Sequence, residues 1–232
     1  MRKIIRRILF AISVAFVVAA CTDNKAYETS FCALVDISGT YAGEKSHVVN
    51  IIKAGIVPEM VPGDSLFFVK IDSNSYSEEN LVTKLTLDYR PTKANSQKLA
   101  IAKILDKFGK GNARSRLTDI SGALMLCSDY LKSTKSGTQI MFVFSDMKEE
   151  LPAGVVRKFA DDEFEGMDIV AMNVIKLSKD SINPEIYRKR LKKWDERITA
   201  AGARSWNTLL DATKIREFIE QAKSRMCARE SQ

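Results

Sequence analysis

The sequence is poor in the side chains that most often build catalytic and zinc sites. His47 is the only histidine among 232 residues, so no Ser-His-Asp triad can form around another one. The four cysteines form no Cys-x-x-Cys motif and no cysteine-histidine cluster, which argues against a zinc site. Internal repeats and low-complexity segments are absent as well. With 45% hydrophobic residues, the chain is able to bury one substantial core, as a single domain does.

Outside its first seven residues the chain has little excess of either charge. The formal net charge is +7, but Arg2, Lys3, Arg6 and Arg7 account for four of these charges. Removing them from the 36 basic residues leaves 32 against 29 acidic ones, a balance of +3. So small a balance argues against nucleic acid as a partner.

The first twenty residues have the pattern of a secretory signal peptide. The basic residues precede the mostly apolar stretch from Ile8 to Ala20, whose 13 residues are too few for a comfortable membrane span. Small residues end this stretch immediately before Cys21, and this arrangement resembles the bacterial lipobox. The resemblance implies that residues 1–20 are removed and that Cys21 carries lipid. An uncleaved anchor with an incidental cysteine is the alternative.

A lipid on Cys21 implies an exported chain anchored to the membrane of a bacterial cell envelope. Thr22 follows in place of the aspartate that commonly signals inner-membrane retention, which favours the outer membrane if the cell has two. Residues 21–30 are polar and lack apolar periodicity, so we expect a lipid-anchored tether. Its nine residues after the cysteine reach roughly 30 Å when extended.

Three further cysteines, Cys32, Cys127 and Cys227, follow the tether. An oxidising, exported setting permits one disulfide among them, and the odd number leaves one cysteine over. Cys32 and Cys127 lie in apolar surroundings, where free thiols also behave as small buried hydrophobic groups. The sequence leaves both interpretations open.

Strand and helix patterns alternate along the rest of the chain, which we expect to form one domain over residues 31–228. The predicted strands cover residues 31–35, 66–71, 81–87, 139–144, 169–174 and 205–210. Predicted helices begin near Glu44 and cover residues 96–108, 120–131 and 212–227. Because residues 81–87 alternate between apolar and polar, they fit an edge strand. The pattern predicts an α/β fold with a doubly wound, mostly parallel six-stranded sheet, one antiparallel edge strand and helices on both faces.

Oxygen-bearing side chains follow two of these strands and precede one helix. Asp36, Ser38 and Thr40 come directly after the first strand, Thr118 lies just before the helix at 120, and Asp146 follows the strand at 139–144. Open α/β sheets bind ligands at the carboxyl ends of their strands. These five residues therefore predict a metal site.

The order Asp-x-Ser-x-Thr, a later threonine and a strand-terminal aspartate resembles the metal-ion-dependent adhesion site of the von Willebrand factor A (VWA) family. The family has serine where Thr40 stands, and both residues offer a hydroxyl. The resemblance implies that Ser38 and Thr40 bind the ion directly, and that Asp36, Thr118 and Asp146 bind it directly or through water. Two carboxylates among several hydroxyls suit Mg²⁺ better than a carboxylate-rich calcium site, with Mn²⁺ or Ca²⁺ as alternatives.

An ion with only two nearby carboxylates stays electron-poor and leaves a coordination position for a Glu or Asp of a partner protein. We therefore expect a non-enzymatic, membrane-tethered protein that binds another protein through a divalent cation. Tyr41 and Asp72 are expected at the rim of the binding face. A VWA scaffold that binds its partner without metal is the second hypothesis.

Two further alternatives concern the same residues. The hydroxyl groups and Asp119 are also of the types that cap helices through side-chain to backbone hydrogen bonds. The loop Asp36 to Thr40 also resembles the Asp-x-Asp-Gly-Thr motif of haloacid-dehalogenase-type phosphatases. Ser38 replaces the second aspartate there, and a hydroxyl does not perform the proton transfer of a carboxylate near neutral pH.

One basic, amphipathic segment, residues 188–194, has no place in this site. Such a segment contacts anionic lipid or nucleic acid in some proteins, but charge runs more commonly form solvated helix faces.

Overall fold

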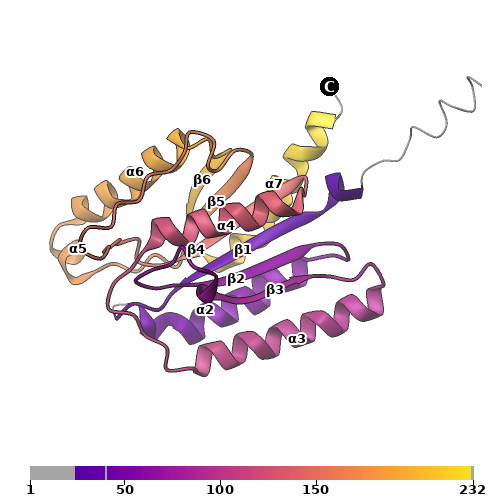
Figure 1. Cartoon of the computed structure of the whole chain (residues 1–232), viewed down its shortest axis with the longest axis horizontal. Helices are drawn as coiled ribbons and strands as arrows, with labels where there is room; N and C mark the ends of the chain where they lie inside the picture. The colour runs from indigo at the N-terminus through magenta and orange to yellow at the C-terminus, as the bar shows by residue number, and fades with distance from the viewer. Residues whose placement is uncertain (1–23, 40, 231–232) are drawn as a thin grey trace, which may run out of the picture.

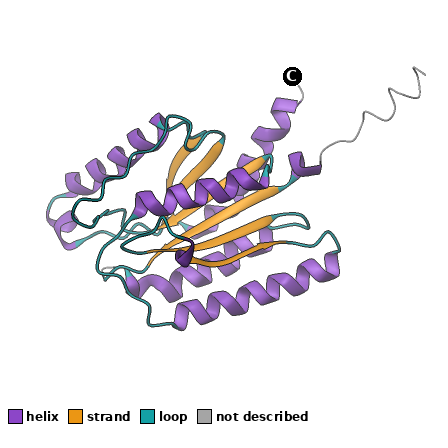
Figure 2. Ribbon diagram, viewed as in Figure 1, coloured by secondary structure: helices purple, strands orange, loops and turns teal. Residues whose placement is uncertain are grey.

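A six-stranded sheet forms the centre of the protein (Figures 1 and 2). The computed structural model describes residues 24–39 and 41–230. The strands are β1 (Thr29–Asp36), β2 (Ser65–Ile71), β3 (Leu81–Thr86), β4 (Thr138–Phe144), β5 (Met167–Met172) and β6 (Ser205–Leu209). They lie in the order β3-β2-β1-β4-β5-β6, and every pair is parallel except β2 with β3. The predicted fold class, including the antiparallel edge strand, is confirmed.

The central strand β1 is buried along its whole length because helices cover both faces of the sheet. Alternate residues of a strand point to opposite faces, so β1 contributes to two separate cores. Phe31, Ala33 and Val35 belong to one core, while Cys32 and Leu34 belong to the other.

Five longer helices form the outer layers (Figure 1). The first core is covered by α2 (Lys45–Ile51), α3 (Pro91–Lys110) and α7 (Ile215–Glu230). The second core is covered by α4 (Ile120–Thr134) and α6 (Pro184–Ala200), with the short α5 (Ser178–Ile182) preceding α6. The remaining helical turns are η1 (Asn24–Tyr27), η2 (Ala42–Glu44), η3 (Ile52–Ile56), η4 (Val57–Glu59), η5 (Glu78–Asn80) and η6 (Ala212–Lys214). None of the helices in the described part of the chain is long and apolar enough to cross a membrane.

Helix α3 and strand β1 begin earlier than the sequence patterns predict. Helix α3 begins at Pro91 rather than at residue 96, because proline in the first turn lacks only a backbone N–H that the helix leaves unpaired anyway. Strand β1 begins at Thr29, within the expected tether, and the backbone N–H of Thr29 donates to the buried Asp64 carboxylate at 2.8 Å. Predictions for residues 1–23, including the signal peptide and Cys21, lie outside the described residues.

A disulfide between Cys32 and Cys127 joins the central strand β1 to helix α4. The two Cα atoms lie 6.1 Å apart, and both side chains are fully buried. The two cysteines are separated by 95 residues, so the bond closes a long loop of the chain. The side chain of the third cysteine, Cys227, lies outside the described part of the structure.

We expect the paired substitution Cys32→Ala and Cys127→Ala to lower the free energy of unfolding by about 2 to 5 kcal/mol, because the unfolded chain loses its cross-link. Urea denaturation followed by circular dichroism measures this change. Cys227→Ala serves as the control, because it removes a cysteine without breaking the Cys32–Cys127 bond, and it should leave stability within about 1 kcal/mol of the wild type. Alkylation of Cys32 in denatured, unreduced wild-type protein would show instead that the bond does not form.

Candidate metal-binding site

The parallel pairing of β1 with β4 brings Asp36 next to the residues that follow β4. Val35 is paired with Phe144, so Asp36 and Ser145 are the next residues in register. The Ser145 hydroxyl donates to Asp36 Oδ2 at 2.7 Å, and the backbone N–H of Ser38 donates to Asp36 Oδ1 at 2.7 Å. Both oxygens of a fully buried carboxylate are thus held in place by hydrogen bonds.

Two buried carboxylates lie at this edge of the sheet. Burial raises the pKa of Asp36, the hydrogen bonds from Ser145 and Ser38 oppose that rise, and the negative charge of Asp146 adds to it. Asp146 is itself only 1% exposed, and its Oδ1 accepts a hydrogen bond from the Lys148 backbone at 2.8 Å. A bound cation would offset both the repulsion and the loss of hydration.

Ser38 provides a hydroxyl without a partner beside these carboxylates. Its Oγ is buried and makes no hydrogen bond of normal geometry within the described residues, although it lies close enough to the Asp36 carboxylate to help lower the pKa of that group. An unsatisfied buried polar group costs about 1 to 3 kcal/mol, so such groups call for an explanation. Neither of the two helical turns that follow, η2 and α2, receives a side-chain cap. The capping alternative is therefore wrong for Ser38.

The loop before α4 forms backbone hydrogen bonds with both the loop after β1 and the loop after β4. Thr118 forms an antiparallel bridge with Glu150, in which each backbone N–H donates to the other residue's carbonyl at 2.9 Å. Ser115 forms a parallel bridge with Ser38, and its N–H donates to the Ile37 carbonyl at 2.9 Å. The structure thus brings together the loops that carry Asp36, Ser38, Thr118 and Asp146, whereas Thr40 lies outside the described residues.

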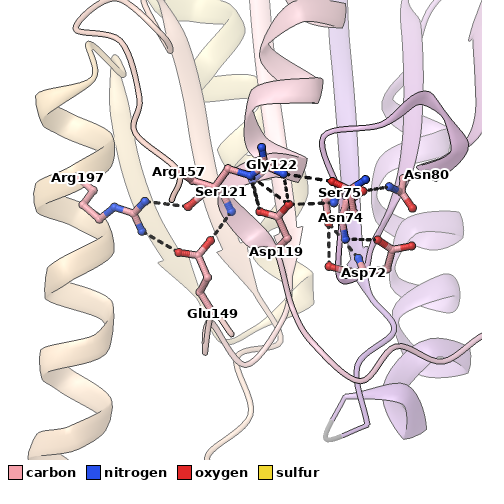
Figure 3. Close-up of polar contacts among 10 residues, drawn as sticks. All are labelled: Asp72, Asn74, Ser75, Asn80, Asp119, Ser121, Gly122, Glu149, Arg157 and Arg197. Carbon is pink, nitrogen blue, oxygen red and sulfur yellow. Dashed lines mark hydrogen bonds and ion pairs between the residues drawn. The ribbon is translucent and has the colours of Figure 1, made fainter. Parts of the chain in front are cut away.

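Asp119, rather than Thr118, caps helix α4 (Figure 3). Its fully buried carboxylate accepts hydrogen bonds from the Gly122 N–H at 2.8 Å and the Ser75 N–H at 3.0 Å. Arg157 approaches the same carboxylate, with Nη2 at 2.7 Å from Oδ2. One side chain therefore fixes the start of α4, the loop after β2 and the long segment after β4.

Glu149 extends this network to helix α6 (Figure 3). Its Oε1 accepts from the Ser121 N–H at 2.7 Å, and its Oε2 lies 3.3 Å from Nη1 of Arg197. The second terminal nitrogen of Arg197 donates to the Ser121 hydroxyl at 2.8 Å. The segment that carries Asp146 is thereby attached to both α4 and α6. Sequence patterns gave no signal for these ion pairs, because their partners are far apart in the chain.

Tyr41 was expected at the rim of the site, and this prediction is wrong. The residue is fully buried beneath the site, where its hydroxyl donates to the Asn173 carbonyl at 3.0 Å. Burial raises the pKa of Tyr41, so the hydroxyl stays protonated. Asp72 does lie at the edge, where it lines a cleft of 590 Å³ together with Ile37 and Arg116.

The donor set fits a hard cation that keeps part of its hydration. Within the described residues there is no group of three or more histidine, cysteine, aspartate or glutamate side chains able to hold a metal. The residues that meet here are two carboxylates and hydroxyl groups, and Mg²⁺ binds such oxygen ligands while retaining water. The unpartnered hydroxyl of Ser38 is the feature that such an ion would satisfy.

Neither a protein-family model nor a curated protein sequence matches this chain. Solved structures with a similar arrangement include a von Willebrand factor type A protein from Catenulispora acidiphila, with 11% identity and a TM-score of 0.47 over 86% of this chain and 42% of that one. Manganese-loaded TRAP protein from Plasmodium vivax has 13% identity and a TM-score of 0.47 over 85% and 74%. The open conformation of the pilus adhesin SpaC from Lactobacillus rhamnosus GG has 14% identity and a TM-score of 0.46 over 86% and 30%. This chain spans less than half the length of the first and third of these proteins.

We expect Arg157→Met to destabilise the protein by about 3 kcal/mol, because it leaves the buried Asp119 carboxylate without its positive partner. Urea denaturation measures the change in the free energy of unfolding. Arg188→Met is the matched control, since it removes an exposed ion pair with Glu185 and costs less than about 1 kcal/mol. Equal effects of the two substitutions would show that the Asp119 ion pair does not hold the loops together.

Proposed function

We propose that this chain is a non-enzymatic, membrane-tethered VWA-like protein that binds another protein through a divalent cation. The observation that carries the proposal is the buried, unpartnered Ser38 hydroxyl beside the buried Asp36 carboxylate. A scaffold that binds without metal would offer no new partner to the Ser38 hydroxyl. It would also leave the repulsion between Asp36 and Asp146 without a cation to offset it. Metal binding accounts for the two together.

Asp36, Ser38, Thr40, Thr118 and Asp146 would hold the ion, with Mg²⁺ preferred and Mn²⁺ or Ca²⁺ as alternatives. When bound, the ion supplies a positive centre that accepts a carboxylate oxygen from a glutamate or aspartate of the partner. The protein would fix the orientation of its own ligand side chains before the ion binds. Ser145 orients Asp36, and the Lys148 backbone orients Asp146, so little ordering is left to be done on binding.

Binding is favoured over phosphoryl transfer by the residue at position 38. A haloacid-dehalogenase-type phosphatase needs a second carboxylate there for proton transfer, and serine does not provide one near neutral pH. In addition, both oxygens of Asp36 already accept hydrogen bonds from Ser38 and Ser145. Phosphatase activity toward an aryl phosphate that disappears in Asp36→Ala would reverse this preference.

The tether and the site lie at opposite ends of the central strand. The described chain enters β1 at Thr29, and the candidate site begins at Asp36, so roughly 23 Å of extended strand separates them. A lipid on Cys21 would therefore anchor the amino end of the sheet and leave the metal site facing away from the bilayer. We propose a location in the bacterial cell envelope, with the outer membrane favoured if the cell has two membranes.

Added Mg²⁺ should raise the melting temperature of the wild-type chain by roughly 5 to 10 °C at a hundredfold excess over its dissociation constant. Ser38→Ala and Asp36→Asn should each remove most of this rise, since they take away a ligand. Differential scanning calorimetry with and without chelator measures it. Ser96→Ala, on the exposed side of α3, is the matched control and keeps the full rise. The absence of any rise in the wild type would favour the metal-free scaffold.

Lipidation is tested separately by mass spectrometry of the amino-terminal peptide, which should start at Cys21 and carry acyl chains. Cys21→Ser should move the chain from the membrane fraction of cells to the supernatant, because the anchor is lost. A chain that starts at residue 1 with an unmodified Cys21 would contradict the anchor.

A further inference from the structure

A groove of 660 Å³ lies beside the candidate metal site. It is bounded by α5, by one side of α6 from Ile186 to Arg197 and by the segment that follows Asp146. Leu177, Ile186 and Trp194 give it apolar walls. The groove thus lies at the carboxyl edge of the sheet, on the side of α6.

Trp194 connects the groove directly to the loop after β4, which carries Asp146. Its indole Nε1 donates to the Met147 carbonyl at 2.9 Å, and only 4% of the residue is exposed. Met147 has a φ of 61°, which is uncommon for a residue other than glycine, and its N–H donates to the Ser145 hydroxyl at 3.1 Å. The groove and the candidate metal site therefore share one loop. In this loop Asp146 lies between Ser145, which donates to Asp36, and Met147, whose carbonyl accepts from Trp194.

The lining of the groove carries more positive than negative charge. Six of its lining residues are lysine or arginine, and two are acidic. Arg190 pairs with Asp180 at 2.5 Å, Arg197 pairs with Glu149 at 3.3 Å, and Lys148 pairs with Glu150 at 2.5 Å.

The other three cations form the basic rim, which consists of Lys179, Lys189 and Lys193. All three are exposed, and none lies within ion-pair distance of a carboxylate in the described part of the chain. Lys189 and Lys193 are four residues apart on α6 and so lie on the same side of the helix. A ligand with matching negative charges would find these three ammonium groups free.

We propose that this groove binds an acidic segment of the partner protein, with glutamate or aspartate side chains on the basic rim and an apolar side chain against Leu177 and Ile186. This inference rests on the proposed function, because the same segment would present a carboxylate to the metal site next to Asp146. Charge complementarity and the shared loop support a protein segment. An anionic lipid surface is less well placed, since the described chain enters the sheet from the opposite end, at Thr29.

The test uses the full-length chain in non-ionic detergent and a fluorescein-labelled peptide of four glutamates around a central leucine. Fluorescence polarisation with 1 mM Mg²⁺ measures binding. Lys179→Glu, Lys189→Glu and Lys193→Glu together should weaken binding at least tenfold, and binding of the wild type should weaken as salt is raised.

A matched control carries the same change of charge on the other face of the sheet. Lys103→Glu, Lys107→Glu and Lys110→Glu lie on exposed positions of α3, far from α5 and α6 (Figure 1). These three changes together should alter peptide binding less than threefold. Both triple variants should keep the Mg²⁺-dependent rise in melting temperature, which shows that they fold and that the metal site is intact.

The outcomes separate the groove from the metal site. If the Mg²⁺ effect is present but the two triple variants weaken peptide binding equally, or the wild type does not bind the peptide, the groove proposal is overturned and metal binding stands. If the groove variant alone loses the peptide while no protein responds to Mg²⁺, the groove stands and the metal proposal fails. Binding to phosphatidylglycerol vesicles but not to the peptide, lost in the groove variant, would reassign the groove to lipid and overturn the proposal.

Discussion

The burial of the Asp36 carboxylate at the end of the central strand is the constraint on which the functional edge of this protein depends. A charged group removed from water needs hydrogen bonds and a positive partner. Ser145 and the Ser38 backbone supply the hydrogen bonds, but a second buried carboxylate, Asp146, lies close enough to raise the pKa of Asp36 further. The site thus concentrates negative charge around an unpartnered hydroxyl, which is the arrangement a hard cation would relieve.

Two neighbouring carboxylates, Asp119 and Glu149, have a structural role and are paired with arginine. Asp119 is as deeply buried as Asp36, yet it has Arg157 and two backbone N–H groups as partners, and Glu149 likewise has Arg197 and Ser121. These residues fasten the loops around the site to α4 and α6. Asp119 and Glu149 each have an arginine as ion-pair partner, whereas the printed partners of Asp36 are hydrogen-bond donors from two serines.

The loop after β4 contributes to both the candidate metal site and the groove proposed to bind a partner segment. Asp146 faces the candidate metal site, while Met147, the next residue, is held by Trp194 in the wall of the basic groove. A partner that presents acidic residues in an extended segment would meet both features without any change in the fold. In a chain anchored as proposed, this face would be directed away from the membrane, because the described chain enters β1 at the other end, at Thr29.

Local patterns in the sequence determined the strands, the edge position of β3 and the places where oxygen-bearing side chains follow the strands. The apolar run at Phe31 to Val35 and the alternation at 81–87 each follow from the side-chain surroundings of one strand, so neighbouring residues suffice to predict them. The tertiary structure decided which distant groups meet. It paired Cys32 with Cys127, buried Tyr41 against Asn173, neutralised Asp119 with Arg157 and left the Ser38 hydroxyl unpartnered. Each of these depends on the packing of elements that lie tens of residues apart, and periodicity along a single element carries no information about that packing.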